Sequence, residues 1–329
     1  MRRFKNILLI CDEESVNEEV IGRAIWLAKA NGASVTLVDL VLSGPGELGQ
    51  LFGALSGMRG FDVEHEVLEF HRTRLAEIGA PIKSEGIETT ETVLQGIPFV
   101  QVIRKVLRDG HDLVIKGASG DRDRNSFLFG STDLHLLRKC PCPVWIMKKS
   151  NRKKYARILA AVDPRSAEEQ HVALNTLIMD LATSLSKMDG SELHVVNAWR
   201  LDEEDTLRHS GFANISDAEV DRLVAEKRRE CERELDGLLG RYPEDGGDRN
   251  VHLLKGAASE LIPELARKTR AELIVMGTVG RTGIQGFFIG NTAEAILNQV
   301  DCSVLAVKPP GFESPVRLNG DADTAESPD

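Results

Sequence analysis

One glycine spacing occurs twice in this chain, and it restricts the folds that the chain can adopt. In each copy the order is glycine, two residues, glycine, nine residues, glycine. The copies lie 160 residues apart, as Gly117, Gly120 and Gly130 in the first half and Gly277, Gly280 and Gly290 in the second. A fixed spacing repeated at this distance indicates the duplication of a unit of roughly 150 residues. The length of 329 residues likewise favours about two domains.

Both halves alternate short apolar runs with amphipathic segments, which predicts strands alternating with helices. In the first half we expect strands at 5–12, 34–41, 87–94, 111–116 and 143–148, and helices at 17–31, 61–76, 98–108 and 131–139. In the second half we expect strands at 156–163, 192–198, 251–254, 273–276 and 302–308, and helices at 167–188, 216–239, around Pro263 and at 293–297.

This order predicts the α/β class, with two tandem open parallel five-stranded sheets that carry helices on both faces. The predicted domains are residues 1–150 and 151–310, joined by a basic, polar stretch at 150–155. Residues 311–329 are acidic and rich in Pro, Ser, Gly and Asp, which predicts a disordered tail. Residues 43–60 are rich in glycine and predict a mobile loop or a short helix.

Each glycine-rich loop joins the end of the fourth strand to a helix, where backbone N–H groups can converge on an anion. An aspartate, Asp12 or Asp163, ends the first strand of each half. Ligands of open parallel sheets bind at the carboxyl ends of the strands. If the first and fourth strands are neighbours, each aspartate and its glycine loop border the same crevice.

This arrangement fits a nucleotide. The glycines offer N–H donors to phosphate, and Arg281 can neutralise phosphate charge. Polar side chains at the helix start can add a hydrogen bond, namely Asn291 and Thr292 in the second half and Ser131 and Thr132 in the first. Asp163 or Asp12 can accept hydrogen bonds from ribose hydroxyls or from the adenine edge. The alternative is that the glycines only shape a turn between strand and helix.

Composition and motifs argue against several other functions. The net charge of −10 and the pI near 5.4 disfavour binding to nucleic acid or to an anionic membrane. No signal peptide and no membrane-spanning run is expected, and five cysteines, few and odd in number for a long chain, suit a reducing cytoplasm. The glycines carry no Walker Gly-Lys-Ser/Thr and do not follow the first strand as a dinucleotide fingerprint would. No metal-binding motif and no Ser/His/Asp triad is recognised, so we expect no metal site and no catalytic residues.

Three stretches of the sequence resemble the universal stress protein family in its tandem form: Gly277–Ile284 (GTVGRTGI), Gly290–Glu294 (GNTAE) and Ser131–Pro141 (STDLHLLRKCP). The resemblance extends over about residues 4–309. It implies two five-stranded α/β domains that pair within the chain, and a possible homodimer. It also implies cytoplasmic stress resistance, including tolerance of DNA damage. The resemblance further implies that ATP or AMP can be bound, with Mg as a possible companion of ATP only.

By the motif match, phosphate contacts carry over to Gly277, Gly280, Gly290 and Asn291, and to Gly117, Gly120, Gly130 and Ser131. Asp163 and Asp12 become the nucleoside acceptors. Asn291 departs from the usual Ser/Thr, and Asp121 and Asp123 place acids in the first loop. We therefore expect a regulatory or protective nucleotide-binding protein rather than an enzyme, with the second half as the better site. The alternatives are a slow ATP hydrolase or nucleotidyl transferase, and an interaction scaffold with degenerate pockets.

Two histidine predictions concern residues outside these loops. His65 and His71 are expected on a solvated helix face, and His135 is expected to pack at a helix surface rather than to serve catalysis.

Overall fold

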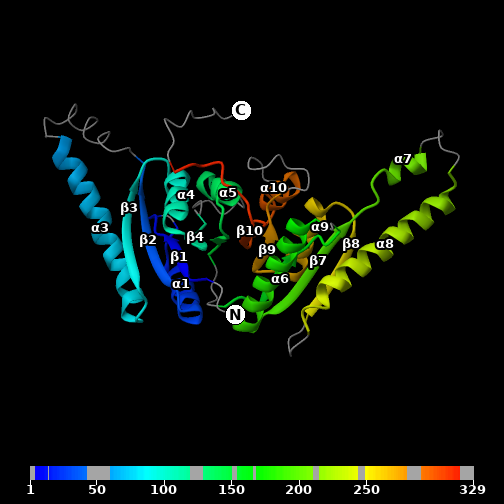
Figure 1. Ribbon diagram of the computed structural model, residues 1–329, viewed down its shortest axis with the longest axis horizontal. Coiled ribbons are helices and arrows are strands. Elements are labelled where there is room, and N and C mark those ends of the chain that lie inside the picture. Colours follow the sequence, from blue (N-terminus) through cyan, green and yellow to red (C-terminus); the bar gives the residue numbers. More distant parts are fainter. Residues whose placement is uncertain are drawn as a thin grey trace. The chain divides into compact units, whose positions relative to one another are not determined.

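The computed structural model describes residues 4–13, 15–42, 60–118, 129–149, 154–165, 168–209, 215–243, 249–279 and 290–318. These residues form two compact units. The first unit contains residues up to 153 together with 312–318, and the second contains 154–279 and 290–311. Each unit is an α/β domain (Figure 1).

The first unit has five strands in the order β3-β2-β1-β4-β5, and each neighbouring pair is parallel. The strands are β1 (Asn6–Ile10), β2 (Ser34–Val41), β3 (Thr89–Gln95), β4 (Leu113–Gly117) and β5 (Val144–Met147). The helices are α1 (Glu18–Asn31), α3 (Gly60–Ser84), α4 (Pro98–Asp109) and α5 (Ser131–Lys139). Helices α1 and α3 contact each other, and α4 contacts α5, so the helices form two layers.

The second unit repeats this topology, with the parallel order β8-β7-β6-β9-β10. Its strands are β6 (Arg157–Ala161), β7 (Glu192–Trp199), β8 (Arg249–Lys255), β9 (Leu273–Gly277) and β10 (Ser303–Val307). Its helices are α6 (Glu169–Asp189), α7 (Glu204–His209), α8 (Asp217–Leu239), α9 (Ala258–Thr269) and α10 (Asn291–Leu297). The predicted fold class, two tandem parallel five-stranded α/β sheets, is confirmed.

Apart from residues at their ends, the central strands β1, β4, β6 and β9 are buried, as parallel sheets covered on both faces require. All five residues of β4 and of β10 are buried, with no alternation of apolar and polar positions. The edge strands β3 and β8 are only partly buried. Burial of the central apolar runs, at about 25 cal/mol per Å², is therefore the main stabilising contribution to each sheet.

Helix boundaries agree with the sequence pattern where caps are strong. Gly32 ends α1 with φ of 60° and donates its N–H to the carbonyl of Ala28, as a glycine C-cap does. Ser216 caps α8, and the side chain of Glu219 accepts from the Ser216 N–H. Residues 43–59, expected as a loop or short helix, lie outside the described residues.

Helix α3 differs from its prediction, because it continues past Ala76 to Ser84 and contains Pro81. Leu75 and Ile82 are seven residues apart on one face, and both are fully buried. Their packing against the sheet outweighs the hydrogen bond that proline removes. Helix α7 was not predicted, because it is only 6 residues long and buries no side chain.

The prediction for His71 was wrong. Its Nδ1 lies 2.6 Å from Oδ2 of Asp39, a residue of β2 that is 1% exposed. Arg74 donates to the same carboxylate oxygen at 2.6 Å. The helix periodicity had shown a charged face, but it could not show that β2 presents a buried acid to that face.

The residues after the second unit return to the first. Arg104 Nε donates to the carbonyl oxygen of Arg317 at 3.1 Å. Residues 312–318 therefore belong to the described fold, while residues 319–329 of the predicted tail lie outside the described residues. The division between the two compact units falls at 153/154, three residues beyond the predicted domain boundary at 150/151.

Candidate functional site

The sheet order brings the predicted site residues together in each unit. Strand β1 pairs with β4 and strand β6 pairs with β9, so the first and fourth strands are neighbours in both halves. Asp12 lies two residues beyond Ile10, which pairs with Lys116 just before Gly117. Asp163 lies two residues beyond Ala161, which pairs with Met276 just before Gly277. Both aspartates thus lie at the carboxyl end of the sheet, next to the strand that leads into a glycine loop.

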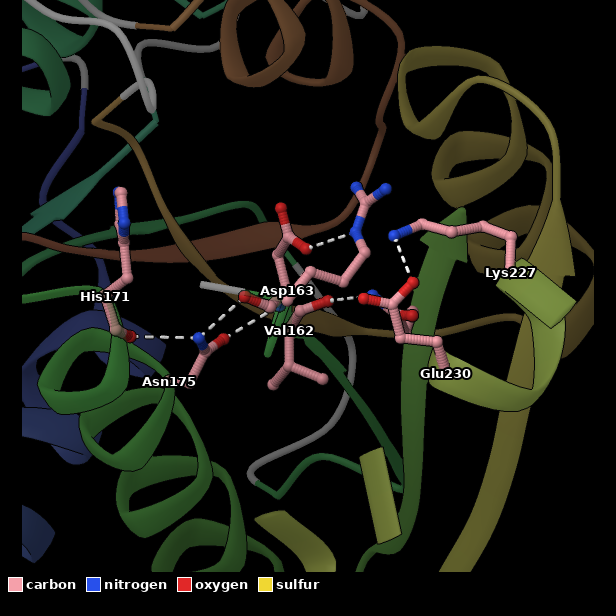
Figure 2. Close-up of polar contacts among 8 residues, drawn as sticks. Val162, Asp163, His171, Asn175, Lys227 and Glu230 are labelled. Atoms are coloured by element: carbon pink, nitrogen blue, oxygen red, sulfur yellow. Dashed lines mark hydrogen bonds and ion pairs between the residues drawn. The ribbon is translucent and has the colours of Figure 1, made fainter. Parts of the chain in front are cut away.

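In the second unit, the backbone of Asp163 is held by a side chain from α6 (Figure 2). The Asp163 N–H donates to Oδ1 of Asn175 at 2.8 Å, and Nδ2 of Asn175 donates to the Asp163 carbonyl at 2.8 Å. Nδ2 also donates to the His171 carbonyl at 2.9 Å. One residue earlier, the carbonyl of Val162 accepts from Nδ2 of Asn197 at 3.0 Å. Because Asn175 is 5% exposed, these bonds fix the chain where it leaves the sheet.

The Asp163 carboxylate itself is accessible. Its side chain is 41% exposed, and Oδ1 accepts from Nε of Arg165 at 2.9 Å. An ion pair at this exposure contributes about 0–1 kcal/mol, so a ligand can replace it at little cost. The backbone is therefore fixed while the carboxylate can still exchange partners.

Helix α8 contributes charged groups to this part of the unit. Lys227 and Glu230 form an ion pair with a separation of 2.6 Å between Nζ and Oε2 (Figure 2). Burial raises the pKa of the Glu234 carboxyl, and the charge of Glu230 raises it further. Lys227 and Arg165 act on the same pKa in the opposite direction. Arg165 therefore lies near enough to α8 to influence its acids.

Thr278 fastens the base of the second glycine loop. Its carbonyl accepts from the N–H of Gly290 at 3.0 Å, which joins the start of the loop to its end. Its N–H donates to Val307 at 3.3 Å, and its hydroxyl accepts from the ammonium of Lys308. Thr278 is fully buried and Lys308 is 6% exposed. A nearly buried positive charge therefore lies at the base of the loop that the sequence assigns to phosphate.

The first unit is built differently at the same place. The Lys116 ammonium lies 3.2 Å from Oδ2 of Asp12 and 3.0 Å from Oδ1 of Asp133, and it donates to the Gly117 carbonyl at 3.0 Å. Lys116 is 1% exposed and Asp133 is fully buried. Asp12 is therefore held inside the unit rather than presented to solvent as fully as Asp163 is.

The remaining predicted residues fall into two groups. Gly290 precedes α10, which begins with the exposed residues Asn291 and Thr292. Gly130 precedes α5, which begins with the exposed Ser131. Three predicted residues lie outside the described residues, namely Gly120, Gly280 and Arg281.

Sequence reasoning missed four residues near these loops, Asn175, Thr278, Lys308 and Lys116. A signal was available for Lys116, because it is a charge within an otherwise apolar buried strand. Asn175 and Thr278 gave none, since a polar residue in a helix or after a strand is ordinarily solvated.

Among the described residues, no cluster of three or more His, Cys, Asp or Glu side chains is placed to hold a metal ion. In the same part of the chain, no helix has the length and apolar character needed to cross a membrane.

Both halves have the same α/β topology, and each has a candidate site at the carboxyl end of its parallel sheet. The chain is therefore a tandem α/β protein with two candidate sites. Residues 3–148 and 154–308 each match the Universal stress protein family. The chain belongs to this family. It is 28% identical over 326 residues to Universal stress protein E of Escherichia coli K12, covering 98% of this chain and 100% of that one. The Universal stress protein E homolog of Haemophilus influenzae is 27% identical over 319 residues, covering 93% and 98%.

Solved structures agree with the fold. A putative universal stress protein from Pseudomonas aeruginosa UCBPP-PA14 has a TM-score of 0.70 at 23% identity, covering 94% of this chain and 95% of that one. A universal stress protein from Archaeoglobus fulgidus has a TM-score of 0.56 at 18% identity, covering 92% and 98%.

Proposed function

We propose that the second unit binds an adenine nucleotide and that the protein acts as a regulatory or protective stress protein rather than as an enzyme. In this proposal Asp163 accepts hydrogen bonds from the nucleoside. The glycine loop from Gly277 to Gly290 receives the phosphates, with Arg281, Asn291 and Thr292 as further contacts. The ligand is ATP or AMP, and Mg accompanies ATP only.

One observation carries this proposal. Asn175 fixes the backbone of Asp163 beside the strand that enters the glycine loop, while the Asp163 carboxylate remains 41% exposed. A site whose acceptor is already oriented loses less freedom when it binds a ligand. Family membership and the repeated glycine spacing support the same conclusion.

The surrounding charges favour an anion at the loop. Lys308 places a nearly buried ammonium at the base of the loop, and an ammonium with little access to water attracts phosphate more strongly than a solvated one. In the first unit the position equivalent to Thr278 is Ala118, which has no hydroxyl group. The lysine equivalent to Lys308 is Lys148, and its ammonium lies 4.8 Å from the ring centre of Phe129.

Calorimetric titration with ATP and with AMP tests the proposal. We expect saturable binding by the wild type and at least a tenfold loss of affinity in Gly280→Val and in Asp163→Asn. Gly120→Val is the matched control, since it makes the same change in the other half, and it should leave the affinity unchanged. If the wild type gives no binding heat with either nucleotide, the proposal is wrong.

A turnover assay separates binding from catalysis. Phosphate release from ATP above a no-protein blank, lost in Asp163→Ala, would favour the slow hydrolase instead. The stress role is tested by deleting the gene and measuring survival after a DNA-damaging treatment.

All five cysteines are free thiols, which is consistent with a proposed cytoplasmic location.

A further inference from the structure

Lys116 is surrounded by oxygen atoms within the first unit: it donates a hydrogen bond to one carbonyl and forms ion pairs with two carboxylates. Here three acceptors surround it, the carboxylates of Asp12 and Asp133 and the carbonyl of Gly117, all within 3.2 Å. A positive charge is thus enclosed at the carboxyl end of β4, next to the aspartate that the sequence assigns to a nucleoside.

The partners of Lys116 are also engaged. Asp12 uses its second oxygen, Oδ1, to accept from the Ser15 N–H at 2.8 Å. Asp133 uses its Oδ2 to accept from the Gly130 N–H at 3.2 Å. Both carboxylates therefore have protein partners at each oxygen.

Ser15 also covers the glycine that begins the first loop. A Cβ placed on Gly117 would lie 1.9 Å from the carbonyl oxygen of Ser15, and Ser15 is 1% exposed. The backbone of Ser15 thus lies directly against Gly117. On Gly277 the corresponding Cβ would meet only the end of the Leu174 side chain, at 2.8 Å.

The second unit lacks this cluster. The constant offset of 160 residues places Met276 at the position of Lys116 and Ala293 at the position of Asp133. Asp163 occupies the place of Asp12, and its side chain is 41% exposed against 25% for Asp12. The two halves therefore differ in charge at two equivalent positions within an otherwise repeated fold.

We propose that the Lys116 ammonium takes the place of a ligand beside Asp12, so that one chain carries a single nucleotide site, in the second unit. This inference rests on the proposed function. A ligand entering the first unit would have to separate Asp12 from Lys116, and losing a contact between charged groups weakens binding by about tenfold to a hundredfold.

The chain itself supplies the test variant. Lys116→Met with Asp133→Ala gives the first unit the residues of the second and removes one charge of each sign. We expect the wild type to bind one ATP per chain and the double variant to bind two, the added event being abolished by Asp12→Asn. Circular dichroism shows whether the variant is folded. Two sites in the wild type, or a folded double variant that gains no Asp12-dependent binding event over the wild type, would overturn the inference.

The proposed function and this inference fail separately. If the wild type binds no nucleotide, the second-unit proposal is wrong, and the inference is then decided by whether the double variant gains an Asp12-dependent event. Acetylation of native wild-type protein gives a second measurement that requires no variant. Lys116 should remain unmodified while Lys29, whose side chain is 52% exposed, reacts. Modification of both at similar rates would mean that Lys116 is not enclosed.

Discussion

The side chain of Asn175 bonds to both the N–H and the carbonyl of Asp163, each at 2.8 Å. Replacing Asn175 by alanine leaves two backbone groups of Asp163 without these partners, which costs about 1–3 kcal/mol of stability in the second unit. Because the acceptor is no longer oriented, we also expect ATP affinity to fall about tenfold or more. Urea unfolding and calorimetry measure the two effects. Thr176→Ala is the control, since the Thr176 hydroxyl donates within its own helix, to the Val172 carbonyl.

The Lys308 ammonium and the Thr278 hydroxyl should stabilise one another. A hydrogen bond to a charged group contributes about 1.5–3 kcal/mol, so Thr278→Val should lower the free energy of unfolding by about that amount. A double-mutant cycle with Lys308→Met isolates the interaction. Both single variants should also weaken ATP binding, because the base of the loop loses a charge or its anchor. A coupling energy near zero would show that the contact contributes nothing.

Equivalent glycines should differ in their tolerance of alanine. In Gly117→Ala the new methyl group meets the Ser15 carbonyl, which is backbone and cannot turn aside. We expect a loss of about 2 kcal/mol, within the range for overpacking. In Gly277→Ala it meets the flexible end of Leu174, and the loss should stay below about 1 kcal/mol. Hydrogen exchange read by mass spectrometry assigns each loss to its unit. Equal losses would contradict the packing difference.

The local pattern of apolar residues and the internal duplication made much of the fold predictable from the sequence. Buried runs and glycine caps gave the strands and most helices. The rule that ligands bind at the carboxyl ends of parallel strands placed Asp163 near Gly277. The partners that distinguish the two sites are separated along the chain, as Lys116 is from Asp12. Such contacts depend on side-chain direction in the packed unit, which periodicity does not report. Asp39 shows the same limit, because its partners on α3 looked solvated.

The free energy of unfolding of the first unit should depend strongly on the ion pair between Asp39 and Arg74. Asp39 is 1% exposed, so Arg74→Met would leave a buried charge with one fewer cationic partner. Removing one member of a buried pair costs about 3–5 kcal/mol. In the second unit Asn197 of β7 is the residue equivalent to Asp39 of β2, because each follows the residue that pairs with the end of the first strand. Adding Asp39→Asn to Arg74→Met should therefore recover part of the loss in urea unfolding. No recovery would mean that Arg74 acts by packing alone.

Acidification should destabilise the fold through three histidines that are buried or partly buried. Burial lowers the pKa of His111, His194 and His252 below the ordinary value of 6.5. The unfolded chain then binds more protons than the folded chain between each folded pKa and 6.5. Stability is therefore full above pH 6.5 and falls as the pH decreases through this window, by up to about 1.4 kcal/mol per pH unit for each proton.

His111 allows this pH dependence to be assigned. His111 is 4% exposed, and burial is the largest cause of its lowered pKa. The second unit has Ala271 at the equivalent position, so alanine is compatible with this part of the fold. His111→Ala should reduce the slope of unfolding free energy between pH 7 and pH 5. His65→Ala, at an exposed histidine, should leave the slope unchanged. A slope that falls equally in both variants would show that burial of His111 is not its cause.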